Sequence, residues 1–144
     1  MLDQRMSDFR KRCVDLGLAH THQRMVIYRA FASSESHPTP ESVFEQVRRE
    51  IPSISLGTVY KSIRTFVDNG LLREVNVLHE TVRLDANLDD HHHLVCIGCK
   101  SVTDVPAEMV QPVELRGALP EGFRLKRSRV EILGVCASCA AKEF

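Results

Sequence analysis

The sequence lacks an excess of charge of either sign, because 19 lysine and arginine residues balance 19 aspartate and glutamate residues. This balance excludes a highly basic, histone-like nucleic-acid binder, although it leaves room for a local basic face. A long apolar run is also missing. The stretch from Leu133 to Ala141 is far shorter than the roughly 20 residues that span a membrane. The first residues carry charge and contain no apolar signal core. We therefore expect a cytoplasmic protein with no membrane segment.

Low-complexity segments are absent as well. Hydrophobic residues make up 43% of the 144 residues and charged residues 26%, as in an ordinary globular protein. This composition excludes a disordered tail, a collagen-like fibre and a low-complexity scaffold. The length allows one or two small domains.

Four of the five cysteines form two Cys-x-x-Cys pairs. In a reducing compartment such pairs bind metal more often than they form disulfides. Each pair presents two thiolates to one ion, so two pairs complete a tetrahedron. We predict structural zinc, with a redox dithiol at one pair as the alternative. The paired cysteines are Cys96, Cys99, Cys136 and Cys139, and Cys13 is interpreted as an ordinary helix residue.

The first half of the chain predicts helices followed by a hairpin. This order is typical of a winged helix-turn-helix, whose last helix enters the DNA major groove. On that helix, Lys61 and Arg64 would face phosphate or guanine, and Tyr60 could reach a base. The alternative is a protein-binding domain on which these charges are solvated. Apolar spacing and capping residues predict helices over 3–16, 22–32, 40–50 and 56–68, and strands over 71–77 and 81–84.

A run of three histidines enters an expected strand in the second half. Because side chains alternate along a strand, His91 and His93 share one face and His92 points the other way. Asp104 could reach across to them from the next strand, and Asp85 lies just upstream. Two imidazoles on one face form half of a metal site, although a polar loop can carry three histidines by chance.

The rest of this half is expected to be short elements. The pattern predicts a strand over 102–105, a short helix over 106–119 that is interrupted or restarted near Pro112, and a long strand over 122–133. This part of the chain has only about 55 residues, and the core of a domain of that size gives marginal stability. Zinc and a partner subunit would therefore add needed stability.

Three motifs, taken together, are specific. They are Ser55-Leu56-Gly57-Thr58-Val59-Tyr60-Lys61 with Asn69-Gly70-Leu71-Leu72, His91-His92-His93-Leu94-Val95-Cys96, and the two cysteine pairs. With them the chain resembles, over nearly its whole length, the ferric uptake regulator (Fur) family of bacterial metal-dependent repressors. The resemblance implies an α+β homodimer that binds a double-stranded DNA operator with pseudo-palindromic half-sites. Its implied parts are an N-terminal winged helix-turn-helix over 1–84, a hinge over 85–90, and a small α/β dimerisation domain with structural zinc over 91–144.

The resemblance also sorts the ligands and the DNA contacts. It implies one structural Zn²⁺ per subunit on the four paired cysteines, and one regulatory Fe²⁺ or Mn²⁺ per subunit. Imidazoles with carboxylates suit the latter two metals. The implied regulatory ligands are His37, Asp85, His91, His93 and Asp104. The implied DNA contacts are Tyr60, Arg64, Lys61 and Arg24.

Within the family, the chain looks most like the peroxide-responsive (PerR) branch, because Asp85 and Asp104 stand where iron sensors usually carry glutamate. In that branch iron and peroxide convert a histidine matching His37 or His91 to 2-oxo-histidine, and the operator is released. Manganese supports DNA binding without this chemistry. His92 and Asp90 lie near an additional metal site of iron-sensing members, but its other ligands are missing.

Other functions are also compatible with parts of the pattern. The same class of repressor could sense iron, zinc or manganese availability without ligand oxidation. A metalloenzyme would need a general base beside the His/Asp site, and none is evident. A zinc-ribbon interaction module would bind no operator. We therefore expect a regulator and no enzyme activity.

Overall fold

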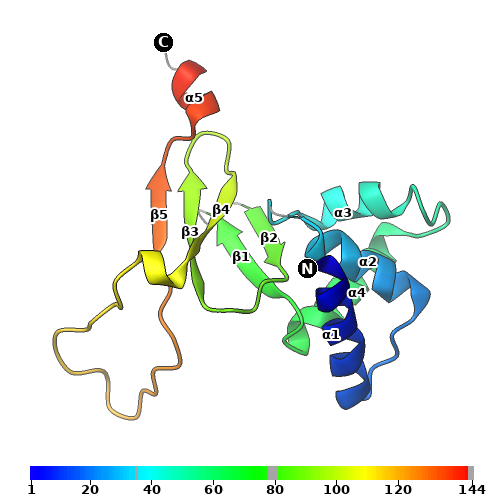
Figure 1. Ribbon diagram of the computed structural model, residues 1–144, viewed down its shortest axis with the longest axis horizontal. Helices are drawn as coiled ribbons and strands as arrows, with labels where there is room; N and C mark the ends of the chain where they lie inside the picture. Colours follow the sequence, from blue (N-terminus) through cyan, green and yellow to red (C-terminus); the bar gives the residue numbers. More distant parts are fainter. Residues whose placement is uncertain (35, 78–80, 143–144) are drawn as a thin grey trace. The chain divides into compact units, whose positions relative to one another are not determined.

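The computed structural model describes residues 1–34, 36–77 and 81–142, and its contacts divide the chain into two compact units. The first unit, Met1–Leu88, contains a group of helices and a two-stranded sheet; the second, Asp89–Phe144, contains a three-stranded sheet (Figure 1). Within the described ranges, every helix is too short or too polar to cross a membrane.

Side-chain caps start three of the four helices of the first unit. Thr21, Thr39 and Ser55 each accept a hydrogen bond from the backbone N–H three residues later, at 3.3, 3.2 and 3.1 Å. Each cap satisfies a donor that the first helical turn leaves without a partner. The helices are α1 (Leu2–Asp15), α2 (His22–Ala32), α3 (Pro40–Val47) and α4 (Leu56–Asp68).

The predicted spans of α2 and α4 are confirmed, whereas the predicted extension of α3 to residue 50 is wrong. After Val47 the chain tightens into a turn, in which Glu50 N–H donates to the Val47 carbonyl at 3.0 Å. Such three-residue hydrogen bonds satisfy the last carbonyls of a helix and end it.

A hairpin follows α4 and completes the winged-helix arrangement. Its strands, β1 (Arg73–Val77) and β2 (Thr81–Asp85), are antiparallel, and Arg73 lies opposite Asp85. The predicted hairpin turn at 78–80, which contains His79, lies outside the described residues. Leu84 N–H donates to the Pro38 carbonyl at 3.2 Å, so β2 is attached to the segment that precedes α3.

Three aromatic side chains form the centre of the core of this unit. Phe9 stacks on Tyr28 with ring centroids 4.0 Å apart, and Phe66 meets both rings edge-on at 5.4 and 5.9 Å. Because these rings come from α1, α2 and α4, their contacts hold the helices together.

The second unit is built on β3 (His91–Cys96). It pairs antiparallel with β4 (Val102–Pro106) and parallel with β5 (Glu131–Gly134), giving the order β4-β3-β5. A single 3₁₀ turn, η1 (Ala107–Met109), follows β4, and α5 (Ala137–Lys142) follows β5.

Two predictions for the second unit are wrong. The predicted helix over 106–119 contains only the turn η1, and Pro112 lacks the N–H that a longer helix would use. The predicted strand over 122–133 is formed only from residue 131 onward. Alternation alone does not make a strand. Among the described residues, 122–129 pair with no neighbouring strand, and Phe123 and Leu125 stay exposed. Helix α5 was not predicted.

We expect the substitution Phe66→Ala to destabilise the first unit by about 3–5 kcal/mol, because it empties the middle of the aromatic cluster. Urea unfolding of the full chain, followed by the helical signal in circular dichroism, measures this loss. Val14→Ala is the control, because Val14 is 66% exposed and its loss should change stability by no more than about 0.5 kcal/mol. Equal unfolding midpoints for the two variants would contradict the packing described here.

Candidate metal centres

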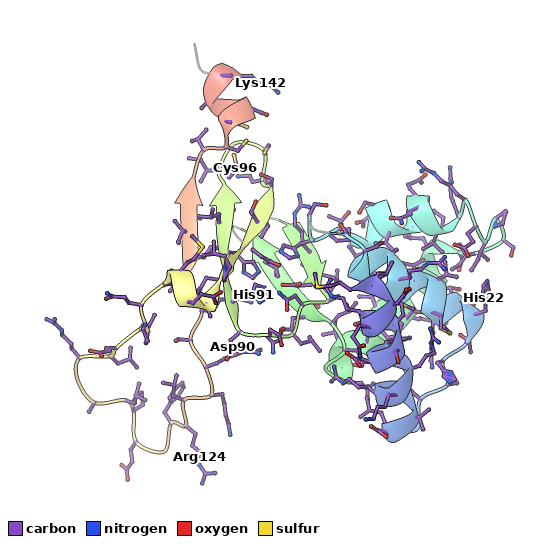
Figure 2. All side chains as sticks on the ribbon, viewed as in Figure 1. His22, Asp90, His91, Cys96, Arg124 and Lys142 are labelled. Atoms are coloured by element: carbon purple, nitrogen blue, oxygen red, sulfur yellow. The ribbon has the colours of Figure 1, made fainter. Side chains whose placement is uncertain are left out.

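The two cysteine pairs meet at one end of the three-stranded sheet. The parallel register places Cys96 opposite Gly134, so that the chain leaving β5 brings the second pair to the first. His91 and Cys96 lie at opposite ends of β3 (Figure 2). The sulfur atoms of Cys96, Cys99, Cys136 and Cys139 all lie within 4.8 Å of one another. A redox dithiol needs only one pair, whereas four converging thiols fit tetrahedral zinc.

Backbone donors favour the thiolate form of Cys96. The N–H groups of Cys136 and Cys99 point at its Sγ, at 3.3 and 3.5 Å, and they lower its pKa to about 6. The pKa of Cys99 is lowered by hydrogen bonding to Ser101. Hydrogen bonds to the neighbouring thiols of Cys136 and Cys96 raise the pKa of Cys139 to about 12. The group thus combines Cys96, whose thiol ionises readily, with Cys139, whose thiol would release its proton on binding a metal.

Gly98 lies between the first two cysteines, and the sulfur cluster needs a glycine there. A Cβ at this position would stand 2.9 Å from Cys139 Sγ and 3.2 Å from Cys139 Cβ. Any side chain would therefore push the fourth thiol away from the others. The sequence analysis missed this residue, although a glycine inside a Cys-x-x-Cys pair is a usable signal.

Two further predicted ligands, His37 and Asp85, come together in the first unit. His37 precedes α3 and Asp85 ends β2, and the Leu84–Pro38 hydrogen bond joins the two segments. Both side chains are buried, and His37 Nδ1 lies 3.6 Å from Asp85 Oδ1. Asn87 N–H donates to the same carboxylate at 2.8 Å, which holds its orientation.

The other three predicted ligands come together in the second unit. As the alternation predicts, His91 and His93 lie on one face of β3, and their Nε2 atoms are 3.0 Å apart. Asp104 lies opposite His93 in β4, with Oδ1 at 3.3 and 3.4 Å from the two Nε2 atoms.

A neighbouring carbonyl fixes the tautomer of the neutral His91 ring. Its Nδ1 lies 2.6 Å from the carbonyl oxygen of Asp89, so that the ring donates a proton there. In the neutral ring Nε2 then carries the lone pair. An imidazole held in this way by a carbonyl is the usual arrangement of a metal-ligating histidine. His92 has a different role: its Nδ1 accepts the Val130 N–H at 2.8 Å, at the start of β5.

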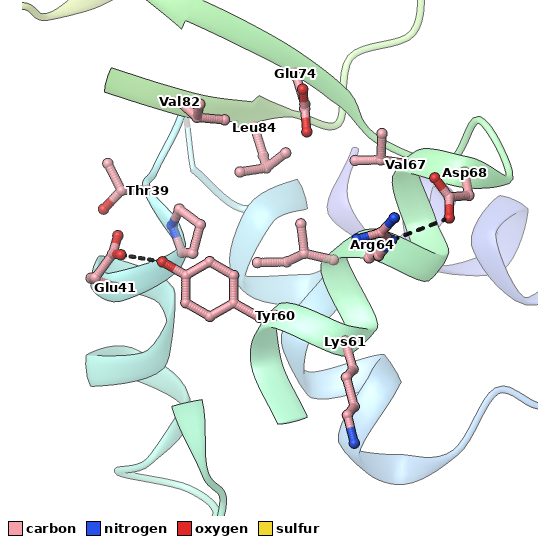
Figure 3. A pocket seen from close by; sticks show the side chains of 12 residues that line it. Thr39, Glu41, Tyr60, Lys61, Arg64, Val67, Asp68, Glu74, Val82 and Leu84 are labelled. Carbon is pink, nitrogen blue, oxygen red and sulfur yellow. Dashed lines mark hydrogen bonds and ion pairs between the residues drawn. The ribbon is translucent and has the colours of Figure 1, made fainter. Parts of the chain in front are cut away.

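The predicted DNA contacts of α4 line a groove of about 870 Å³ between this helix, the start of α3 and the hairpin (Figure 3). Tyr60 donates its hydroxyl proton to Glu41, and this bond lowers the pKa of Glu41 and raises that of Tyr60. Lys61 is exposed. The side chain of Arg64 is 85% exposed, and its Nε atom lies 3.9 Å from Asp68 Oδ2.

Arg24 is not among the described residues that line this groove. Its guanidinium donates to the Ala19 carbonyl at 2.8 Å, which ties it to the loop before α2. Glu41 is a groove residue that the sequence analysis missed, because its bond to Tyr60 joins different helices.

We expect Gly98→Ala to weaken zinc binding by about tenfold or more, because the added methyl group displaces Cys139. Competition with a chromophoric chelator measures the affinity. Gly134→Ala is the matched control, because nothing lies within 4 Å of its added Cβ. If both variants bound zinc as tightly as the unchanged chain, the close approach at Gly98 would be wrong.

Comparisons with known proteins agree with this architecture. A sequence profile of the ferric uptake regulator family matches residues 15–133. The peroxide operon regulator of Bacillus subtilis (strain 168) is 32% identical over 129 residues, which cover 90% of this chain and 89% of that protein.

Solved structures share the fold. A zinc-bound manganese uptake regulator is 26% identical, with a TM-score of 0.66 and coverage of 88% of this chain and 97% of that one. A zinc uptake regulator in complex with zinc and DNA is 18% identical, with a TM-score of 0.68 and coverage of 99% and 97%. The chain therefore belongs to the ferric uptake regulator family of metal-responsive transcriptional regulators, whose members are DNA-binding dimers rather than enzymes.

Proposed function

We propose that this protein is a metal-dependent DNA-binding repressor that senses hydrogen peroxide through iron-catalysed oxidation of a histidine ligand. The observation that carries the proposal is the donor set, in which Asp85 and Asp104 are the carboxylates beside three buried imidazoles. The name of the similar Bacillus subtilis protein, a peroxide operon regulator, supports the same function.

The two ligand groups would hold one regulatory ion per subunit. The first unit offers His37 and Asp85, which are too few to hold an ion firmly, and the second offers His91, His93 and Asp104. Together they make five nitrogen and oxygen donors, a set that suits Fe²⁺ or Mn²⁺. Binding both groups would join a DNA-binding domain over 1–84 to a dimerisation domain over 91–144 through a hinge over 85–90. Loss of the ion would uncouple them.

The four cysteines would hold a structural zinc ion in each subunit, because only their thiolates offer the soft donors that zinc prefers. The functional unit would be a homodimer on a pseudo-palindromic operator, acting in the cytoplasm where that DNA lies.

Bound Fe²⁺ would supply the electron that begins peroxide cleavage. The chain's own contribution is to hold an oxidisable C–H beside that reaction. In the overall change one peroxide oxygen ends on the C2 carbon of the imidazole and the other leaves as water. The ring loses two electrons and peroxide gains them. His91 suits this role because the Asp89 carbonyl fixes its ring, and His37 because burial keeps it from reacting in solution.

A second candidate is a repressor of the same family that senses iron, zinc or manganese availability without ligand oxidation. The likeness to a manganese uptake regulator favours it, and the same five donors would also bind Mn²⁺. The two candidates differ in one chemical outcome, which is whether a ligand is oxidised.

We expect peroxide to add one oxygen atom to the peptide holding His37 or His91, and only when the protein carries iron. The protein is loaded with Fe²⁺ without oxygen, treated with equimolar peroxide, digested and analysed by mass spectrometry. The Mn²⁺-loaded protein is the control, because Mn²⁺ does not supply the electron. Unmodified peptides together with intact metal-dependent DNA binding would favour the second candidate.

The DNA-binding face would be the exposed side of α4. Tyr60 and Arg64 are the main proposed contacts, with Lys61 beside them and Arg24 at the start of α2. Because the chain has no net charge, affinity would depend on a few placed contacts and on the dimer.

We expect Arg64→Ala to weaken DNA binding by about tenfold, the cost of losing one guanine or phosphate contact. Fluorescence anisotropy with Mn²⁺ present, on a duplex selected by the unchanged chain from random sequences, measures the affinity. The matched control is Arg49→Ala, an exposed arginine after α3. Unchanged affinity in Arg64→Ala would remove this helix face from the interface.

A further inference from the structure

Arg83 reaches from the hairpin to the segment that carries His37. It lies on β2, two residues before Asp85. Its Nη1 atom donates to the His37 carbonyl at 3.2 Å and lies 3.4 Å from the Ser36 carbonyl. One side chain thus contacts the two peptide carbonyls on either side of the Cα atom of the proposed ligand His37.

The backbone of His37 needs such support. Its φ is +50°, in the left-handed region that residues other than glycine rarely adopt. The next residue is Pro38, and a residue before proline normally prefers an extended backbone. Conformations of this kind persist where the surrounding contacts over-determine them. Here Arg83 holds the His37 carbonyl, and Leu84 N–H holds the Pro38 carbonyl at 3.2 Å.

The burial of Arg83 Nε indicates that this contact is more than an incidental one at the surface. Arg83 Nε is buried and has no hydrogen-bond partner in the described part of the chain. Burying a donor without a partner is unfavourable, so its presence calls for an explanation. The side chain is oriented by the two carbonyls that it holds, at the cost of its own Nε.

We propose that Arg83 is a positioning residue for the regulatory metal site: by holding the Ser36–His37 backbone it keeps the His37 imidazole aimed beside Asp85. This inference rests on the proposed function, in which His37 and Asp85 are ligands of one ion. Without the tie, His37 would relax toward an extended backbone and its ring would leave Asp85. The first and second units would then lose one of the ligands that join them.

A purely structural role would give a different result. If Arg83 only held the hairpin against the helices, its loss would lower stability and leave metal affinity in the folded protein unchanged. The test therefore measures Mn²⁺ affinity and metal-free stability separately, in the full chain with its cysteine site loaded with zinc.

The informative pair is Arg83→Met and Arg83→Lys. Methionine keeps the apolar stem and removes every donor, whereas lysine keeps a charged donor that can reach a carbonyl. We expect the Mn²⁺ dissociation constant of Arg83→Met to rise by about tenfold, as for other residues that orient a ligand. Arg83→Lys should stay within about threefold of the unchanged chain. The electron paramagnetic resonance signal of free Mn²⁺ measures both, and thermal unfolding without Mn²⁺ measures stability.

Two controls make the outcomes distinct. Arg49→Ala, which removes an exposed guanidinium, should leave Mn²⁺ binding unchanged. His37→Ala should weaken it strongly; if it does not, His37 is no ligand and the proposed function fails. If His37→Ala weakens binding while Arg83→Met does not, only the inference about Arg83 is overturned. Equal weakening in the lysine and methionine variants would also overturn it. Should Arg83→Met fail to fold, Arg83→Leu, which also lacks a donor, takes its place in the same comparison.

Discussion

Parallel pairing between β3 and β5 is the interaction on which the second unit depends. It places Cys96 opposite Gly134 and brings two cysteine pairs, separated by almost 40 residues of mostly exposed chain, to one point. The sheet buries few apolar side chains, among them Val95, Val102 and Val105. A core of this size rarely stabilises a fold without help. An ion on four thiolates would cross-link the sheet to α5, which carries one of the cysteines.

The first unit, in contrast, is stabilised mainly by its own apolar core. Its aromatic cluster and capped helices supply an apolar core without metal. The proposed ligands His37 and Asp85 lie outside this apolar cluster. The segment before α3 and the end of β2 are joined by the Leu84–Pro38 and Arg83–His37 hydrogen bonds. His37 and Asp85, the proposed ligands, are held on this core and would respond to a metal as one body. This is what a sensor needs if metal binding is to change how a DNA-facing helix is presented.

The choice between peroxide and metal sensing depends on chemistry at the ligands rather than on the fold. Relatives with the same architecture carry names of both kinds. A donor set of imidazoles and carboxylates binds iron and manganese alike, so the affinity for the metal does not by itself select the response. The difference is whether a bound metal can transfer an electron to peroxide while an imidazole C–H is held next to it.

The sequence by itself determined the local features: α2 and α4 with their caps, the hairpin, the alternation that groups His91 with His93, and the pairing of cysteines. These follow from spacing and capping, which act over a few residues. Only the tertiary structure decided the rest. Residues 122–129 alternate like a strand but pair with none of the described strands, Gly98 is required by a thiol 41 positions away, and Glu41 and Arg83 bond to residues of other elements. Each of these depends on which surfaces meet after folding, and a periodic pattern carries no information about a partner that is distant in the chain.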